Sequence, residues 1–257
     1  MARLTGGVPV MKPVLFAFLS LIAALPLQAQ VAAVDQPPVP PPAVTATAML
    51  AACVSTLPRE PLELVGDLTV RKQRGIVVSE HPYRLQFDWG ATPQRVQCAL
   101  MDSTGKTQQC LTIIRRDGIP DLELRSGPAL EKQPMPALSA RVLDTDMSWL
   151  DLTLDFLWWK DARLEGEGSV LQQTCDIVLA KPPAPIPGCS GVRVWLLREN
   201  GSLMQAEQLD PDGKPLRRMS VRKLGKFKDR WFIKELDVVA EKSDFRTRLF
   251  VHSVLTP

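Results

Sequence analysis

Two aspartates four residues apart are the side chains of this sequence best spaced for chemistry. Asp151 and Asp155 lie in "DTDMSWLDLTLDFLWWKD", residues 144–161, which holds three of the chain's six tryptophans. On a helix, residues four apart share a face, and carboxyl groups about 5–10 Å apart are the machinery of glycoside hydrolases. That chemistry also needs one carboxyl group with a raised pKa. Solvent-facing aspartates on an amphipathic helix are the simpler interpretation, so we expect both side chains to face water.

The rest of the sequence supplies no catalytic partners for these aspartates. His81 precedes a proline and His252 is five residues from the end, so a Ser-His-Asp or Cys-His arrangement has little to use. No G-x-S-x-G, phosphate-binding or dinucleotide-binding motif is present. The run "DPDGK" at 210–214 lacks the downstream glutamate of a calcium loop and predicts a turn. We therefore predict a non-enzymatic protein without a metal or a cofactor.

The charge balance argues against a nucleic-acid partner. Residues 1–29 contain only Arg3 and Lys12 as charged side chains, and the remaining chain has 29 basic and 28 acidic side chains. A chain so close to neutral lacks the basic footprint that binds phosphates. No nucleic acid is therefore expected among the partners.

The N-terminus has the pattern of a secretory signal. From Met11 the sequence reads "MKPVLFAFLSLIAALPLQAQ", with one lysine, an apolar run over about 14–25, and then Pro26 to Ala29. This predicts a signal peptide over residues 1–29, with Met11 as a candidate start and cleavage after Ala29. The alternative is a retained N-terminal anchor, although the apolar run is short for a membrane helix. Export would place the protein in the periplasm.

A second motif resembles a lipoprotein processing site. "LAAC" at Leu50–Cys53 matches the sequence at which bacterial lipoproteins are cut and acylated on cysteine. It lies about 25 residues beyond the apolar run, whereas such a site has to adjoin the membrane-inserted segment. We therefore expect Cys53 to remain unacylated.

The five cysteines show no metal-binding spacing. They contain no C-x-x-C pair and no neighbouring histidine. Cys98 and Cys110 flank the turn "DSTGK", and they would face each other across a hairpin with a three-residue loop. A two-residue loop would put them on opposite faces, and the sequence leaves this disulfide open.

The chain after residue 29 predicts one helix followed by many strands. Residues 30–43 are rich in proline and alanine and predict an extended linker. Apolar residues at helical spacing over 44–57 predict an amphipathic helix that ends at Pro58. From Leu62 the period changes to two, most clearly in "YRLQFDW" at 83–89.

The strands fall into two meanders separated by an irregular stretch. Glycines and prolines interrupt any periodicity over residues 117–143, which predicts a flap or lid. The second meander begins at "QTCDIVLA" and turns at Asn200-Gly201. About nine or ten strands are expected in total. Because the strands alternate apolar and charged residues, one sheet face should be buried.

The segment around the two aspartates permits two structures. Strict alternation of leucine and aromatic residues over 150–158 fits a strand. Against this, "SWLD" is a helix start signal in which Ser148 caps the helix and Asp151 returns a bond. We favour a short helix. The expected fold is α+β: a strongly curved antiparallel β-sheet over residues 44–257, covered by an N-terminal helix and a short central helix.

At this segment the chain resembles the outer-membrane lipoprotein-sorting family, whose members are LolA/LolB-like. "DTDMSWLDLTLDFLWW" is followed by "CDIVLA", by "VRVWLLRENGSLMQAEQLDPDGKPLRRMSVRKL" and by "RWFIKELDV". The resemblance covers about residues 44–253 and is strongest over 144–240. Within it, the family's spaced motif is matched by Trp195, Gly201, Asp210, Gly213 and Lys214.

The resemblance implies an unclosed β-barrel whose apolar concave side shelters acyl chains of lipoproteins or other lipids. It implies a monomeric periplasmic carrier that contacts membranes peripherally and has transport partners in the inner and outer membranes. The alternative is a non-enzymatic interaction or lipid-sensing module with a solid core. The side chains expected to line the cavity are Leu68, Val70, Tyr83, Leu85, Phe87, Trp89, Trp149, Leu152 and Phe156.

Overall fold

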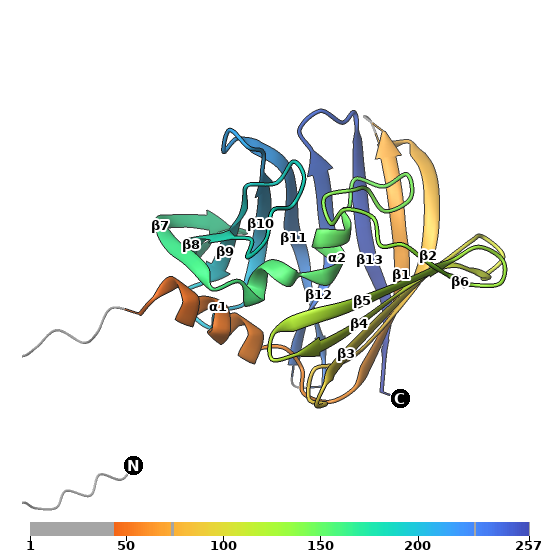
Figure 1. Ribbon diagram of the computed structural model, residues 1–257, viewed down its shortest axis with the longest axis horizontal. Helices are drawn as coiled ribbons and strands as arrows, with labels where there is room; N and C mark the ends of the chain where they lie inside the picture. Colours follow the sequence, from red (N-terminus) through yellow and green to blue (C-terminus); the bar gives the residue numbers. More distant parts are fainter. Residues whose placement is uncertain (1–43, 73–74, 229, 257) are drawn as a thin grey trace, which may run out of the picture. The chain divides into compact units, whose positions relative to one another are not determined.

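Thirteen strands form one antiparallel sheet in the computed structural model of the chain (Figure 1), which describes residues 44–72, 75–228 and 230–256. The strand order is β6-β5-β4-β3-β2-β1-β13-β12-β11-β10-β9-β8-β7, so β6 and β7 are the two edges and the sheet does not close. Figure 1 shows the sheet curving around α2. The predicted signal peptide and Pro-rich linker lie outside the described residues.

Neighbouring strands are also neighbours in the chain, except at the seam between β1 and β13. The first six strands are β1 (Leu62–Lys72), β2 (Val77–Asp88), β3 (Gln94–Met101), β4 (Thr107–Arg116), β5 (Ile119–Ser126) and β6 (Glu131–Gln133). The other seven are β7 (Asp161–Val170), β8 (Gln173–Lys181), β9 (Gly191–Leu197), β10 (Leu203–Leu209), β11 (Pro215–Phe227), β12 (Arg230–Ala240) and β13 (Phe245–Leu255). These two meanders confirm the predicted organisation.

The N-terminal helix α1 (Ala46–Ser55) is where the helical spacing predicted it. The Thr45 side chain caps its start by accepting a hydrogen bond from the backbone N–H of Ala48 at 3.2 Å. Leu50 and Cys53 are buried on one face of α1, and the Cys53 thiol has its pKa raised to about 12 by burial. That Cys53 stays unacylated remains a prediction.

The central segment is a short helix, as favoured from its start signal. α2 (Trp149–Thr153) begins at Ser148, and the 3₁₀ turn η2 (Asp155–Trp158) follows it. Both bonds of the capping box form between Ser148 and Asp151. Leu154 separates the two elements in a left-handed conformation, with φ 50°.

Two strands lie where the sequence predicted an irregular flap. Residues 117–143 include β5 and β6, which extend the first meander to the sheet edge. Asp117 and Gly118 both have positive φ, 52° and 81°, as a two-residue hairpin turn requires. Pro120 is tolerated in β5 because β6 pairs only with Leu124–Ser126. The strand count of nine or ten was therefore too low.

The β3–β4 register settles the cysteine alternatives. Cys98 lies opposite Leu111, and Cys110 lies opposite Ala99. The two cysteines therefore occupy opposite faces of the sheet, and both are free thiols.

Candidate functional site

The concave face of the sheet is apolar across both meanders. Alternate residues of successive strands point inward and form one continuous core with the helices. The inward side chains that are almost completely buried include Leu68, Tyr83, Val96, Leu111, Val178, Val194, Met219 and Val238. The prediction that one face of the sheet is buried is confirmed.

Eight of the nine side chains expected to line a cavity belong to this interior or pack against it. Five of them belong to the buried core: Leu68, Tyr83, Trp89, Trp149 and Phe156. Leu85, Phe87 and Leu152 are partly buried and pack against that core, and Val70 is buried on β1. Their position fits an acyl-binding role, and that role stays a prediction.

The segment from Ser148 to Trp158, here called the central plug, fills the concave side. Leu150 and Phe156 are fully buried, and Trp149 is only 2% exposed. The N-terminal helix α1 contacts η2, and the Thr47 hydroxyl donates a hydrogen bond to the backbone carbonyl of Lys160, two residues after η2. The space that a ligand would need is therefore occupied by the plug.

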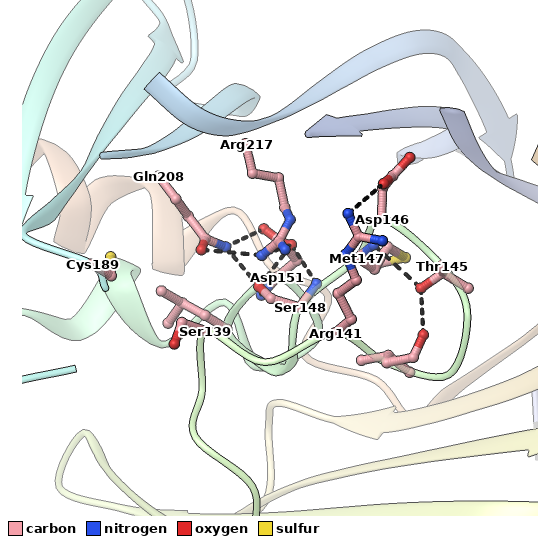
Figure 2. Close-up of polar contacts among 12 residues, drawn as sticks. Ser139, Arg141, Thr145, Asp146, Met147, Ser148, Asp151, Cys189, Gln208 and Arg217 are labelled. Atoms are coloured by element: carbon pink, nitrogen blue, oxygen red, sulfur yellow. Dashed lines mark hydrogen bonds and ion pairs between the residues drawn. The ribbon is translucent and has the colours of Figure 1, made fainter. Parts of the chain in front are cut away.

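A buried polar network fastens the plug to the second meander (Figure 2). Oδ2 of Asp151 accepts bonds from the backbone N–H and the hydroxyl of Ser148, at 2.7 and 2.8 Å. Nε2 of Gln208, on β10, donates to Asp151 Oδ1 at 2.8 Å and to Ser148 Oγ at 2.7 Å. Arg217, on β11, approaches Asp151 Oδ2 to 3.9 Å. Both carboxylate oxygens are thus engaged.

A second buried ion pair fastens the plug to the first meander. Nη1 of Arg115, on β4, donates to Asp155 Oδ1 at 2.6 Å and to the carbonyl of Gly118 at 3.0 Å. Trp159 Nε1 donates to the other oxygen, Asp155 Oδ2, at 3.2 Å. The Arg115 guanidinium also stacks 3.8 Å from the ring centroid of Trp158. Both carboxylate oxygens of Asp155 are therefore hydrogen-bonded.

The prediction that Asp151 and Asp155 face water is wrong. Asp151 is 4% exposed and Asp155 is 8% exposed. Burial raises the pKa of Asp151, while the charge of Arg217 opposes that rise. Burial likewise lowers the pKa of Arg115, against the opposing hydrogen bond and charge of Asp155. The charge of a paired arginine offsets part of the cost of burying each carboxylate. The prediction failed because the periodicity of one segment carries no information about arginines on distant strands.

The geometry of the two carboxylates gives no acid pair. Asp151 turns toward β10 and β11, whereas Asp155 turns toward β4, so the two groups do not converge on a common cleft. In the described part of the chain, no cluster of three or more His, Cys, Asp or Glu side chains is arranged to hold a metal ion. In this arrangement the two carboxylates hold the plug from two sides.

The stretch before the plug is also tied to the sheet. The backbone N–H of Asp146 donates to the hydroxyl of Thr247 on β13 at 2.6 Å. Asp144 accepts hydrogen bonds from Ser79 and contacts His81 Nε2, both at 2.6 Å, on β2. The plug and its leading stretch therefore cross from one meander to the other over the β1–β13 seam.

Sequence reasoning missed the residues that hold the plug. Arg115, Gln208 and Arg217 are all nearly fully buried. A signal was present for Arg217, because it shares the alternating phase of Met219 and Val221 in "PLRRMSVRKL". A basic residue in phase with core residues indicates a buried acidic partner.

Two hollows lie away from this interior. They have volumes of about 440 and 290 Å³, and arginines line both. Asp237 lies within 3.5 Å of Arg222, Arg246 and Arg248, so it forms ion pairs with arginines around these hollows. Neither hollow has the apolar lining that an acyl chain needs.

The fold defines a class of protein: a half-open antiparallel barrel around a helical plug. A DUF1329 family protein from Desulfovibrio piger superposes with a TM-score of 0.69 at 12% identity, covering 82% of this chain and 91% of that one. A protein from Vibrio parahaemolyticus, described as an outer membrane lipoprotein-sorting protein domain, gives 0.70 at 10% identity, with 82% and 91% covered. A LolA superfamily protein from Nitrosomonas europaea gives 0.61 at 15% identity, with 84% and 94% covered.

A family model described as "uncharacterized protein" matches residues 128–256, about half of the chain. The chain therefore belongs to this family. Its fold is that of the LolA-like structures. Comparison with curated proteins gives no match. Across the described ranges 44–72, 75–228 and 230–256, neither helix has the length and apolar character of a membrane span.

Proposed function

We propose that this protein is a periplasmic carrier that shelters the acyl chains of lipoproteins or other lipids on its concave face. The observation that supports this most directly is the central plug, an apolar segment packed on a continuous apolar sheet face. The LolA-like fold and the predicted signal peptide agree with the proposal. The proposed role involves no catalysis, and the carboxylates of Asp151 and Asp155 are used to hold the plug.

The free energy of burying apolar surface allows a lipid to take the place of the plug. Removing an acyl chain from water is worth about 0.8 kcal/mol per methylene group. The chain would replace the contacts that Leu150, Phe156 and Trp149 now make with the sheet. One apolar occupant then substitutes for another, so the main cost of opening is the loss of the two buried polar attachments.

The cargo enters from one membrane and leaves at another in this proposal. A lipoprotein donor in the inner membrane and an acceptor at the outer membrane are the partners that it requires. The carrier needs no bound cofactor, because hiding an acyl chain needs only apolar surface.

One observation favours a second candidate function. The interior is filled in the structure, which also fits an interaction or lipid-sensing module with a permanently solid core. In such a module the plug would never leave the sheet. The two functions therefore differ in whether the plug can be displaced.

The first experiment asks whether the exported protein carries lipid. The purified protein is extracted with organic solvent and analysed by mass spectrometry, and a second arm measures the transfer of a triacylated lipoprotein from liposomes into solution. The carrier predicts bound lipid or released lipoprotein. If neither is found, the interaction module replaces it.

A second experiment uses a variant to test whether the plug can leave the sheet or is permanent core. In the variant Asp155→Asn a neutral amide of the same shape replaces the carboxylate of the buried ion pair, which weakens the attachment to β4 because Arg115 loses its counter-charge. If opening becomes easier by about 1.4 kcal/mol, the apparent affinity for a fluorescent fatty acid rises about tenfold. The matched control is Glu123→Leu, Lys132→Met, which removes an exposed ion pair between β5 and β6. Equal affinity of both variants and the wild type would show that the plug is fixed core.

A further inference from the structure

The hairpin of β11 and β12 extends beyond the strands on either side of it. Pairing between β10 and β11 reaches Ser220, and pairing between β12 and β13 begins at Glu235. Beyond these points the two strands pair only with each other, from Leu224 opposite Ile233 to Phe227 opposite Arg230. Residues 221–234, here called the hairpin arm, are thus a two-stranded extension of the sheet.

The hairpin arm concentrates positive charge on a chain that is otherwise slightly acidic. Its sequence "VRKLGKFKDRWFIK" holds six basic residues and one acidic residue, a net charge of +5. The rest of the chain from residue 30 has 23 basic and 27 acidic side chains, a net of −4. Lys223, Lys226 and Lys228 are exposed, and none of the three forms an ion pair with an acidic side chain among the described residues.

The same arm exposes large apolar side chains. Trp231 is 67% exposed and Leu224 is 37% exposed. Ile233 packs against the core, so Trp231, two residues away on the same strand, lies on the same face of the arm. Lys226 lies directly opposite Trp231 in the register. A tryptophan flanked by lysines is therefore presented at the end of the arm.

Gly225 leaves room for the ring of Phe232, one of the two other aromatic residues of the arm. A side chain at Gly225 would lie 2.5 Å from Cζ of Phe232, on the facing strand. The Phe232 ring can therefore lie across the glycine and is partly buried, whereas Trp231 is left facing solvent. The packing of the arm thus selects which aromatic ring it presents.

We infer that the hairpin arm docks the protein on the surface of an anionic lipid bilayer. Lysines attract a negatively charged surface at long range without needing a fixed bidentate partner. Tryptophan prefers the boundary between headgroups and acyl chains, where its ring is apolar and its N–H stays hydrated. An exposed tryptophan among free lysines matches that boundary better than a folded protein partner. This inference concerns the outside of the arm and does not depend on acyl binding in the interior.

Vesicle binding tests the inference. The purified protein is sedimented with vesicles of phosphatidylcholine alone or with added phosphatidylglycerol, at low and high salt. We expect binding only to the anionic vesicles, weakened by salt. The variant Lys223→Gln, Lys226→Gln, Lys228→Gln should bind about 100-fold more weakly, because each basic residue contributes about 1 kcal/mol at such a surface. The matched control Lys106→Gln, Lys214→Gln changes exposed lysines in other turns and should bind about as the wild type does.

A fluorescence measurement locates the contact. Brominated phospholipids should quench part of the tryptophan emission on vesicle binding, and the variant Trp231→Phe should lose that quenching while keeping its fold. Circular dichroism of each variant confirms folding. The inference is overturned if the wild type does not bind anionic vesicles or if the lysine variant binds them as tightly as the control does. It is also overturned if the quenching persists in the variant Trp231→Phe. Each outcome can occur whether or not the interior carries a lipid, so the proposed function is tested separately.

Discussion

Asp151 and Asp155 lie four residues apart and are bound by arginines from opposite halves of the sheet. Arg217 of β11 approaches Asp151, and Arg115 of β4 binds Asp155. The left-handed residue Leu154 turns the chain between them, so the two carboxylates diverge. A spacing that resembles a catalytic pair in sequence is, in the folded protein, a two-point attachment of the central plug.

The Arg115–Asp155 pair should be strongly coupled. Asp155→Ala leaves a nearly buried guanidinium without its carboxylate and should cost about 3–5 kcal/mol of unfolding free energy, measured by urea denaturation. Arg115→Met should cost a similar amount. The double variant Arg115→Met, Asp155→Leu should lose less than the sum, with a coupling of about 0.5–3 kcal/mol. Strictly additive losses would contradict the buried pair.

Removing the Ser148 cap should lower the free energy of unfolding more than removing the Thr45 cap of the N-terminal helix. Ser148→Ala removes the cap of α2 and also leaves buried Gln208 with one acceptor fewer. The expected loss is about 2–4 kcal/mol, combining the cap and the buried partner. Thr45→Ala removes one exposed cap bond and should cost about 1 kcal/mol. Equal losses in thermal or urea unfolding would argue against the network around Asp151.

Asp151 should make stability depend on pH in an unusual direction for a carboxylate near an arginine. Burial raises the pKa of Asp151 despite the opposing charge of Arg217, so the folded protein holds this proton more tightly than the unfolded chain does. This contribution favours folding below the ordinary aspartate pKa of about 4 and is lost as the pH rises through the raised pKa. Compared with Asp151→Asn, the wild type should therefore gain relative stability as the pH falls from neutrality. Urea unfolding at several pH values measures this, and a difference with the opposite slope would contradict it.

The five cysteines should be unreactive in the folded protein. All are buried, and burial raises the pKa of Cys53 and of Cys98 to about 12. A soluble maleimide at neutral pH should label none of them before unfolding and all five in urea, as counted by mass spectrometry. Rapid labelling of Cys53, or a mass increase for an acyl group, would show that α1 does not pack as described.

Local patterns were sufficient for the curved sheet and both helices. The alternation from Tyr83 to Trp89, the helical spacing through Leu50 and the capping box at Ser148 each depend on residues close together in the chain. The edge strand β7 was harder to predict, because an edge with one free side can be polar and glycine-rich, as "DARLEGEGSV" is. Without a buried face, such a strand has the composition of a linker.

The candidate site could be predicted only in part. The apolar inner face follows from strand alternation, whereas Trp149, Leu152 and Phe156 belong to the plug that packs on it. The attachments of the plug could not be predicted, because the partner of Asp155 is 40 residues away and lies on a different strand. The sequence shows that an aspartate is present, but only the fold determines which arginine forms an ion pair with it.

The β1–β13 seam has a consequence for how the chain assembles. Every other strand pair joins neighbours in sequence, whereas the partners at the seam include Asp67 and Phe250, at opposite ends of the domain. Each meander can form from local contacts as it leaves the ribosome or the export channel, but the seam must wait for the last strand. Until then β1 has an unpaired edge that other chains could join. The sheet is therefore completed only once β13 has been made, and a nascent chain halted before β13 is the species most exposed to aggregation.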